Sequence, residues 1–241
     1  GGTGLSTMLK GLKLHTHNIT AVVTVADDGG SSGILRSDLG MLAPGDVRNC
    51  VSALAEVDPV MGELLNFRFK DGSLKGHSLG NLFLAALNET SSSFDEAVKK
   101  FSHLTGVVGT VYPVTNESVT LSALLEDGRL IEGESHIGVH HDGPKNGIVK
   151  LMVNPEKPKA VDGVIKALEK ADIIVLGPGS LYTSIIPNLL VDGVVDAIKK
   201  SNAVKIYVCN IMSQAGETEN YTVSDHLAAI ERHSYEGIAD I

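Results

Sequence analysis

Tryptophan is absent from the 241 residues, and aromatic side chains make up only 4% of them. Proteins that stack bases on aromatic rings need more of these side chains, so the composition argues against a nucleic-acid platform. Basic residues are also scarce, since 20 Lys and Arg stand against 29 Asp and Glu and the formal net charge is −9. Because nucleic acids and anionic membranes both require basic surface, we expect neither as a partner.

Cysteine and long apolar runs are equally rare. Cys50 and Cys209 cannot build a disulfide framework, no Cys/His spacing is typical of a zinc site, and this usage fits a reducing cytoplasm. No apolar run reaches the roughly 18 residues of a membrane span, and no secretory leader is recognisable. The chain opens on a glycine turn with no strand before it and closes on a strand-like run, so we expect the middle of a longer polypeptide.

Strand-like and helical patterns alternate along the chain, which predicts an α/β fold with a mostly parallel sheet covered on both faces. The predicted strands are β-branched-rich runs that end at Gly, Asn or Asp: Ile19–Ala26, Ile148–Val153, Ile173–Leu176 and Val204–Cys209. The predicted helices lie between them: Thr7–Leu14, Val47–Val57, Leu79–Leu87, Phe94–Leu104, Val161–Lys170, Val191–Lys200 and Val223–His233.

One stretch departs from this alternation. The dipeptide Asp127-Gly128 favours the positive φ angles of a tight hairpin turn. It lies between two strand-like runs, Val119–Glu126 and Arg129–Gly133. We therefore predict a small antiparallel hairpin excursion at about residues 118–140. The whole of residues 1–241 is predicted to be one α/β domain, truncated at both ends.

The first candidate site is the glycine-rich opening of the chain, with Gly2, Thr3, Gly4 and Ser6. Glycines before a helix let the backbone approach a phosphate, and the helix start offers free N–H groups. The pattern is neither a Walker A loop nor G-x-G-x-x-G, and a plain tight turn is the alternative.

The second candidate is the segment ADDGGSSG, which follows the first predicted strand. Asp27 and Asp28 stand at a strand end, where open α/β sheets bind ligands, and Ser31 follows two glycines. A carboxylate there can hold Mg²⁺ against a diphosphate or accept a proton from a hydroxyl group. We expect Asp28 to face the ligand as a catalytic or metal-binding residue and Asp27 to contact the nucleotide; helix capping is the alternative for one of them.

Two further segments open helices. In PGDVRN, Arg48 and Asn49 are candidate phosphate contacts and Asp46 is a second candidate catalytic carboxylate, with a plain helix start as the alternative. In GHSLGN, two glycines leave space beside His77 and Asn81, which makes both candidate ligand contacts; a packed or capping histidine is the alternative.

A second strand–glycine turn–helix unit follows Leu176. The unit resembles a second phosphate cradle, formed by Gly177, Gly179, Ser180 and Thr183. Tyr182 is a candidate for stacking on a base or sugar, with core packing as its alternative. The segment NIMSQAGET trails the last predicted strand and adds Asn210 as a candidate contact.

The chain resembles the 2-phospho-L-lactate transferase (CofD-like) superfamily through six motifs, which occur in this order: GGTG, ADDGGSSG, PGDVRN, GHSLGN, GPGSLYTSIIP and NIMSQAGET. The closer resemblance is to its bacterial branch, the YvcK-type gluconeogenesis factors (UPF0052). That branch is expected to carry Thr and Pro in the last motif, where this chain has Ser213 and Ala215. The resemblance implies a Rossmann-like, three-layer α/β/α fold.

The resemblance also implies two functions for one nucleotide site. The bacterial branch is expected to be a cytoplasmic regulator of carbon metabolism and cell shape that binds UDP-N-acetylglucosamine. The other branch is a Mg²⁺-assisted phosphotransferase that moves a phospholactyl group from a guanosine diphosphate-linked donor to a deazaflavin. We favour the regulator, because a chain so poor in aromatics offers little to a deazaflavin. An NAD-type dinucleotide is a third candidate ligand, and self-association into a homo-oligomer is left open.

Overall fold

The computed structural model describes residues 2–139 and 147–241 and shows a mixed α/β protein. The chain divides into two compact units, Gly2–Ser118 and Val119–Ile241, which are taken in turn. The single domain expected over residues 1–241 stays a prediction. Among the described helices, none has the length and apolar character needed to cross a membrane.

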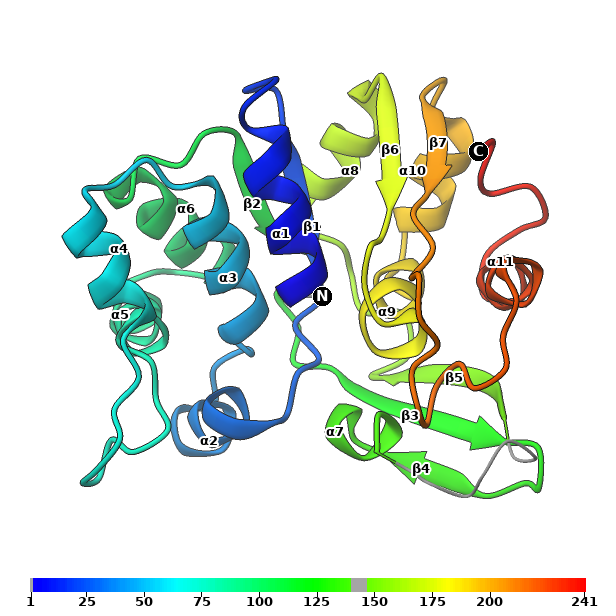
Figure 1. The fold of residues 1–241 in the computed structure, drawn as a ribbon, viewed down its shortest axis with the longest axis horizontal. Helices are drawn as coiled ribbons and strands as arrows, with labels where there is room; N and C mark the ends of the chain where they lie inside the picture. Colours follow the sequence, from blue (N-terminus) through cyan, green and yellow to red (C-terminus); the bar gives the residue numbers. More distant parts are fainter. Residues whose placement is uncertain (1, 140–146) are drawn as a thin grey trace. The chain divides into compact units, whose positions relative to one another are not determined.

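The first unit contains six helices and two short parallel strands, β1 and β2 (Figure 1). The strands pair in register from Thr20 with Thr110 to Val23 with Pro113. Helix α1 packs on α3, while α3 and α6 both contact β2. The elements are α1 Gly2–Leu12, β1 Thr20–Val23, α2 Gly30–Leu39, α3 Gly45–Leu54, α4 Pro59–Asn66, α5 Leu79–Glu89, α6 Phe94–Leu104 and β2 Thr110–Pro113.

In the second unit, β6 and β7 form a parallel pair and β3 lies between β4 and β5 in an antiparallel sheet (Figure 1). Beyond β7, the backbone N–H of Asp240 donates to the carbonyl of Lys205 at 2.7 Å. The elements are β3 Thr120–Leu125, β4 Leu130–Glu132, α7 Glu134–Ile137, β5 Ile148–Asn154, α8 Asp162–Lys170, β6 Ile173–Leu176, η1 Leu181–Ile185, α9 Ile186–Leu189, α10 Val194–Lys200, β7 Val204–Tyr207 and α11 Val223–Arg232.

The α/β class and the predicted hairpin are confirmed, with one correction to the strand pairing. Ser122 of β3 pairs with Glu132 of β4, as the Asp127-Gly128 turn predicts. The run Ile148–Val153, expected in the parallel sheet, instead pairs antiparallel with β3 and extends the hairpin to three strands. A short apolar run does not show which strand it pairs with, and β5 is buried only at Ile148 and Leu151. Residue 140, the end of the predicted excursion, lies outside the described residues.

The start of the chain is a second correction. We expected a glycine-rich turn and then a helix from Thr7, but α1 begins at Gly2. Thr3 and Gly4 therefore form part of its first turn, and the Ser6 hydroxyl donates to the carbonyl of Thr3 at 3.0 Å. Glycine disfavours helices by about 1 kcal/mol relative to alanine, and the packing of α1 on α3 overrides this local preference.

Candidate functional site

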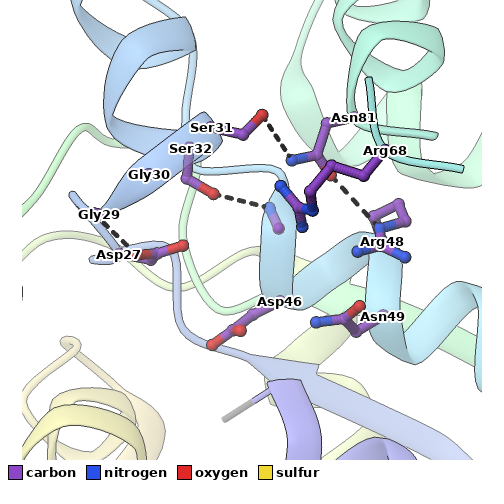
Figure 2. Close-up of a pocket in the computed structure, with 11 residues that line it drawn as sticks. Asp27, Gly29, Gly30, Ser31, Ser32, Asp46, Arg48, Asn49, Arg68 and Asn81 are labelled. Carbon is purple, nitrogen blue, oxygen red and sulfur yellow. Dashed lines mark hydrogen bonds between the residues drawn. The ribbon is translucent and has the colours of Figure 1, made fainter. Parts of the chain in front are cut away.

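A polar pocket of about 210 Å³ lies within the first unit, where the starts of α2 and α3 meet (Figure 2). It draws its lining from segments that are up to 54 residues apart in sequence. The residues that line it are Asp27, Gly29, Gly30, Ser31, Ser32, Gly45, Asp46, Arg48, Asn49, Arg68 and Asn81.

The two helix starts approach each other closely because Gly45 carries no side chain. A Cβ at Gly45 would lie 2.6 Å from the Ser32 hydroxyl oxygen, and the Gly45 backbone N–H donates to that oxygen at 3.2 Å. The first turn of a helix leaves N–H groups without intrahelical partners and carries a partial positive charge. The pocket therefore lies at the positive ends of two ten-residue helices.

Two arginines add full positive charges. Arg48 is only 7% exposed; its Nη1 donates to the Asn66 side-chain oxygen at 2.7 Å and its Nε donates to the Asn81 side-chain oxygen at 3.3 Å. Burial and the nearby Arg68 guanidinium lower the pKa of Arg48, against an opposing effect of Asp46. Within the part of the chain that the structure describes, neither arginine forms an ion pair. Two like charges held together in this way favour an anionic ligand.

Behind the arginines lies a buried polar network. The Ser31 hydroxyl is 2.9 Å from His77 Nδ1, and Asn81 Nδ2 donates to the same hydroxyl at 3.1 Å. Ser31 and Asn81 line the pocket, whereas His77 is not among the described lining residues and contacts Ser31. Ser78 caps α5 by accepting the Asn81 backbone N–H, which fixes Asn81 at the start of that helix.

The pocket also contains two carboxylates, those of Asp27 and Asp46. Asp27 and Asp46 line it on the side away from Arg48 (Figure 2), whereas Asp28, which we expected to face the ligand, is not among the described lining residues. The Asp27 carboxylate turns back to accept the Gly29 backbone N–H at 3.0 Å. β1 ends at Val23, so the alternating side-chain directions of a strand do not apply to Asp27 and Asp28.

These carboxylates bear on the expected magnesium ion. No group of three or more His, Cys, Asp or Glu side chains placed to hold a metal occurs among the described residues. Mg²⁺, however, needs only one or two carboxylates when phosphate oxygens and water complete its shell. Asp27 and Asp46 therefore suit a metal that arrives with a phosphorylated ligand.

The glycine-rich start of the chain reaches this site through Gly2. A Cβ at Gly2 would lie 2.3 Å from Oδ1 of Asp46 and 2.5 Å from Nδ2 of Asn49. Because Gly2 has no side chain, it leaves room for the side chains of Asp46 and Asn49, both of which line the pocket. Thr3, Gly4 and Ser6 are not among the described residues that line the pocket, and their ligand contacts stay predictions.

In the second unit, the turn after β6 is held by the chain itself. Gly177 has a φ of 92°, in the region that favours glycine, and Asn210 Nδ2 donates to the carbonyl of Gly179 at 2.9 Å. Ser180 directly precedes the π-helical turn η1. The Tyr182 ring is fully buried, and its hydroxyl contacts the Ile148 carbonyl and the Tyr221 hydroxyl. This environment favours the core-packing alternative for Tyr182 over stacking on a base.

Glu217 accepts the donors of this turn. Its carboxyl oxygens accept the Tyr182 backbone N–H at 2.8 Å, the Thr183 hydroxyl at 2.8 Å and the Gln214 side-chain amide at 3.0 Å. Burial raises the pKa of Glu217, and its hydrogen bonds with Thr183 and Tyr182 oppose that rise. Thr183 is therefore occupied within the chain.

The structure brings six of the predicted residues together around the pocket, namely Asp27, Ser31, Asp46, Arg48, Asn49 and Asn81. Sequence reasoning missed Ser32, although it stands in ADDGGSSG, and Glu217, although it stands in NIMSQAGET. It also missed Arg68, which belongs to none of the motifs. The binding roles of all these residues stay predictions.

Comparison with known proteins gives one family over the full chain. The model of "2-phospho-L-lactate transferase CofD" matches residues 1–241. The "Gluconeogenesis factor" of Bacillus subtilis is 47% identical over 243 residues, covering 100% of this chain and 75% of its own length. A relative from Clostridium acetobutylicum is 54% identical over 233 residues and covers 97% of this chain, but this chain spans only 52% of that relative.

A solved structure agrees with this result. The crystal structure of a UPF0052 family member from Bacillus halodurans superimposes with a TM-score of 0.95 at 49% identity. The match covers 100% of this chain and 76% of that one. The expected family and its α/β fold are both confirmed.

Proposed function

Since this chain belongs to the CofD family and is similar to bacterial gluconeogenesis factors, we propose that it is a regulatory protein that binds a nucleotide sugar, UDP-N-acetylglucosamine. The pocket of the first unit would hold the phosphates of that ligand. Such a regulator would act in the cytoplasm on carbon metabolism and cell shape.

One observation carries the proposal: Arg48 and Arg68 line a pocket at two helix starts, with no ion pair to either arginine among the described residues. A diphosphate would form ion pairs with both arginines, and Ser31 and Ser32 would add hydroxyl contacts. Neutral ligands would gain little from such a lining. A phosphorylated ligand therefore suits the pocket better than a neutral sugar.

A magnesium ion would fit between this ligand and the carboxylates. Asp27 and Asp46 would hold it together with the phosphate oxygens. The ion would neutralise charge on the diphosphate, which otherwise faces two carboxylates in the same pocket. We therefore expect Mg²⁺ to strengthen binding.

The second candidate function is the phosphotransferase of the same family. The presence of two carboxylates and two arginines in one pocket favours it, because phosphoryl transfer relies on metal and cationic groups around the moving phosphoryl group. We rank it second because the Bacillus subtilis and Halalkalibacterium halodurans relatives are both named gluconeogenesis factor. NAD is kept as the third candidate ligand.

Isothermal titration separates the ligands. We expect saturable heat with UDP-N-acetylglucosamine, stronger with Mg²⁺, and less with GDP or NAD. Arg68→Met should weaken binding about tenfold, the effect of one hydrogen bond to a charged group, whereas Lys70→Met, two residues away and outside the pocket lining, should not. Absence of heat with UDP-N-acetylglucosamine would remove the proposal.

A second experiment tests for transfer. The chain is incubated with a guanosine diphosphate-linked phospholactate, a deazaflavin and Mg²⁺, and products are followed by mass spectrometry. We expect no phospholactylated product. Turnover at about 1 per second, within the ordinary range of enzymes, would establish the phosphotransferase instead.

A further inference from the structure

The orientation of the Asn81 amide follows from its contact with Arg48. A guanidinium can only donate hydrogen bonds, so the Asn81 atom 3.3 Å from Arg48 Nε must be the amide oxygen. The amide nitrogen then faces Ser31 and donates to its hydroxyl at 3.1 Å. One of the two lone pairs of the Ser31 hydroxyl is therefore already used.

His77 decides what the Ser31 hydroxyl can still offer. The two groups are 2.9 Å apart, and one hydrogen must lie between Ser31 Oγ and His77 Nδ1. If Nδ1 is bare, the hydroxyl hydrogen points at the histidine and Ser31 offers the pocket only a lone pair. If Nδ1 carries a hydrogen, both lone pairs of Ser31 are occupied and its hydroxyl hydrogen is free to turn into the pocket.

An anion distinguishes these two states. Its oxygens accept hydrogen bonds, and the neighbouring Arg48 and Arg68 draw it to this pocket. The Ser31 hydroxyl helps an anion only when it donates, which requires a hydrogen on His77 Nδ1. By linkage, binding of the anion must favour the Nδ1–H form, and that form must strengthen binding of the anion.

We infer that His77 is a positioning residue that turns the Ser31 hydroxyl toward a phosphate-type dianion, so that binding of the dianion is coupled to a hydrogen on His77 Nδ1. The inference rests on the anion site of the proposed function. Protonation of the imidazole supplies that hydrogen and adds positive charge behind Ser31. Because the protonated imidazole carries a hydrogen on both ring nitrogens, a lower pH favours the form that binds the anion.

Other charged groups in the pocket, and in the segments that precede or form its elements in sequence, also bear on the pH dependence of binding. They are Asp27, Asp46, Arg48 and Arg68 in the pocket, Asp28 before α2, Arg36 on α2, and Lys70, Asp71 and Lys75 between α4 and α5. The variant His77→Asn keeps all of them. Its short amide can still contact Ser31 but cannot take up a proton, so it removes only the contribution of the imidazole.

The test uses sulfate, which stays a dianion from pH 6 to pH 8 and thus does not titrate itself. Dissociation constants are measured by NMR titration at pH 6 and pH 8 for the wild type, His77→Asn and His103→Asn, a histidine exposed on α6. We expect the wild type and His103→Asn to bind sulfate about tenfold more tightly at pH 6, and His77→Asn to change less than twofold. A tenfold change in His77→Asn would overturn the inference.

The imidazole itself provides a readout that a purely structural role would not move. Nitrogen-15 NMR of the wild type, with the His77 signals assigned by their loss in His77→Asn, should show a hydrogen on Nδ1 when sulfate saturates the protein. Unchanged His77 nitrogens would overturn the inference. Failure of sulfate to bind the wild type would overturn both the inference and the anion site, whereas binding of sulfate but not of UDP-N-acetylglucosamine would remove the nucleotide-sugar proposal alone.

Discussion

The segment after β1 and the segment after β6 share one pattern, a strand followed by glycines, serines and a helix. The hydrogen-bond donors of the two segments, however, have different acceptors. After β1, the pocket at Ser31 and Arg48 offers hydroxyl and guanidinium groups that no carboxylate pairs with among the described residues. After β6, the Tyr182 N–H and the Thr183 hydroxyl both donate to Glu217. In our proposal, a glycine turn at a strand end binds an anion only where the chain does not supply the acceptor itself.

The largest expected effect is that of Arg48→Met on ligand affinity. Loss of the guanidinium removes the most buried positive charge of the pocket, so affinity for UDP-N-acetylglucosamine should fall about 100-fold by isothermal titration. The matched change in the second unit is Arg232→Met, which removes a guanidinium 3.4 Å from the Tyr182 hydroxyl and should alter affinity less than threefold. Equal losses in the two variants would remove the distinction between the segments.

The next effect concerns stability. Glu217→Ala leaves the Tyr182 N–H and the Thr183 hydroxyl without their acceptor, so the free energy of unfolding should fall by about 2–3 kcal/mol in urea. Glu236→Ala, at an exposed position of the same unit, should stay within about 0.5 kcal/mol of the wild type. A loss below 0.5 kcal/mol in Glu217→Ala would mean that the turn does not depend on this acceptor.

The pH dependence of stability sharpens this point. Burial raises the pKa of Glu217, so the folded state holds the proton of this carboxyl more tightly than the unfolded chain does. The proton therefore stabilises the folded state at low pH, and this stabilisation is lost as the pH rises from about 4, the unfolded pKa of Glu, through the folded pKa. Glu217→Gln does not titrate. The stability of the wild type minus that of Glu217→Gln should therefore fall over this range, by about 1.4 kcal/mol for each pH unit that separates the two pKa values. A difference that rises with pH would contradict the assignment.

The smallest effect is that of Gly2→Ala. The new Cβ must displace the ends of the Asp46 and Asn49 side chains, both of which line the pocket, so ligand affinity should fall about threefold while stability changes by less than about 1 kcal/mol. Gly11→Ala on the same helix meets nothing within 4 Å and should leave affinity unchanged while stabilising α1 slightly. An equal affinity in both variants would show that Gly2 does not support the pocket.

Regular patterns made much of the fold predictable. The amphipathic spacing of Phe94–Leu104 and the β-branched run Ile173–Leu176 predict α6 and β6 with their observed bounds. Pairing partners are not encoded in such runs, which is why β5 was expected in the wrong sheet. Helix α4 was missed because proline at its start is as typical of a loop as of a helix. Helix α2 was expected only through the helix-capping alternative for Asp27 and Asp28.

The candidate site was predictable wherever motif residues form its lining. Asp27, Arg48 and Asn81 come from three separate motifs that meet at one pocket. Arg68 was unpredictable, because it lies in no motif and its segment folds back through pairing of Arg68 with Ser78. Asp27 lies among the described lining residues and Asp28 does not, a difference that alternation along a strand cannot indicate.

A crystal structure of the chain with UDP-N-acetylglucosamine and Mg²⁺ tests the central claim most directly. We predict phosphate oxygens within hydrogen-bonding distance of Arg48, Arg68 and Ser31, with the Glu217 contacts to Tyr182 and Thr183 unchanged. Phosphates bound at the turn after β6, with Glu217 displaced and the pocket of the first unit unfilled, would contradict it.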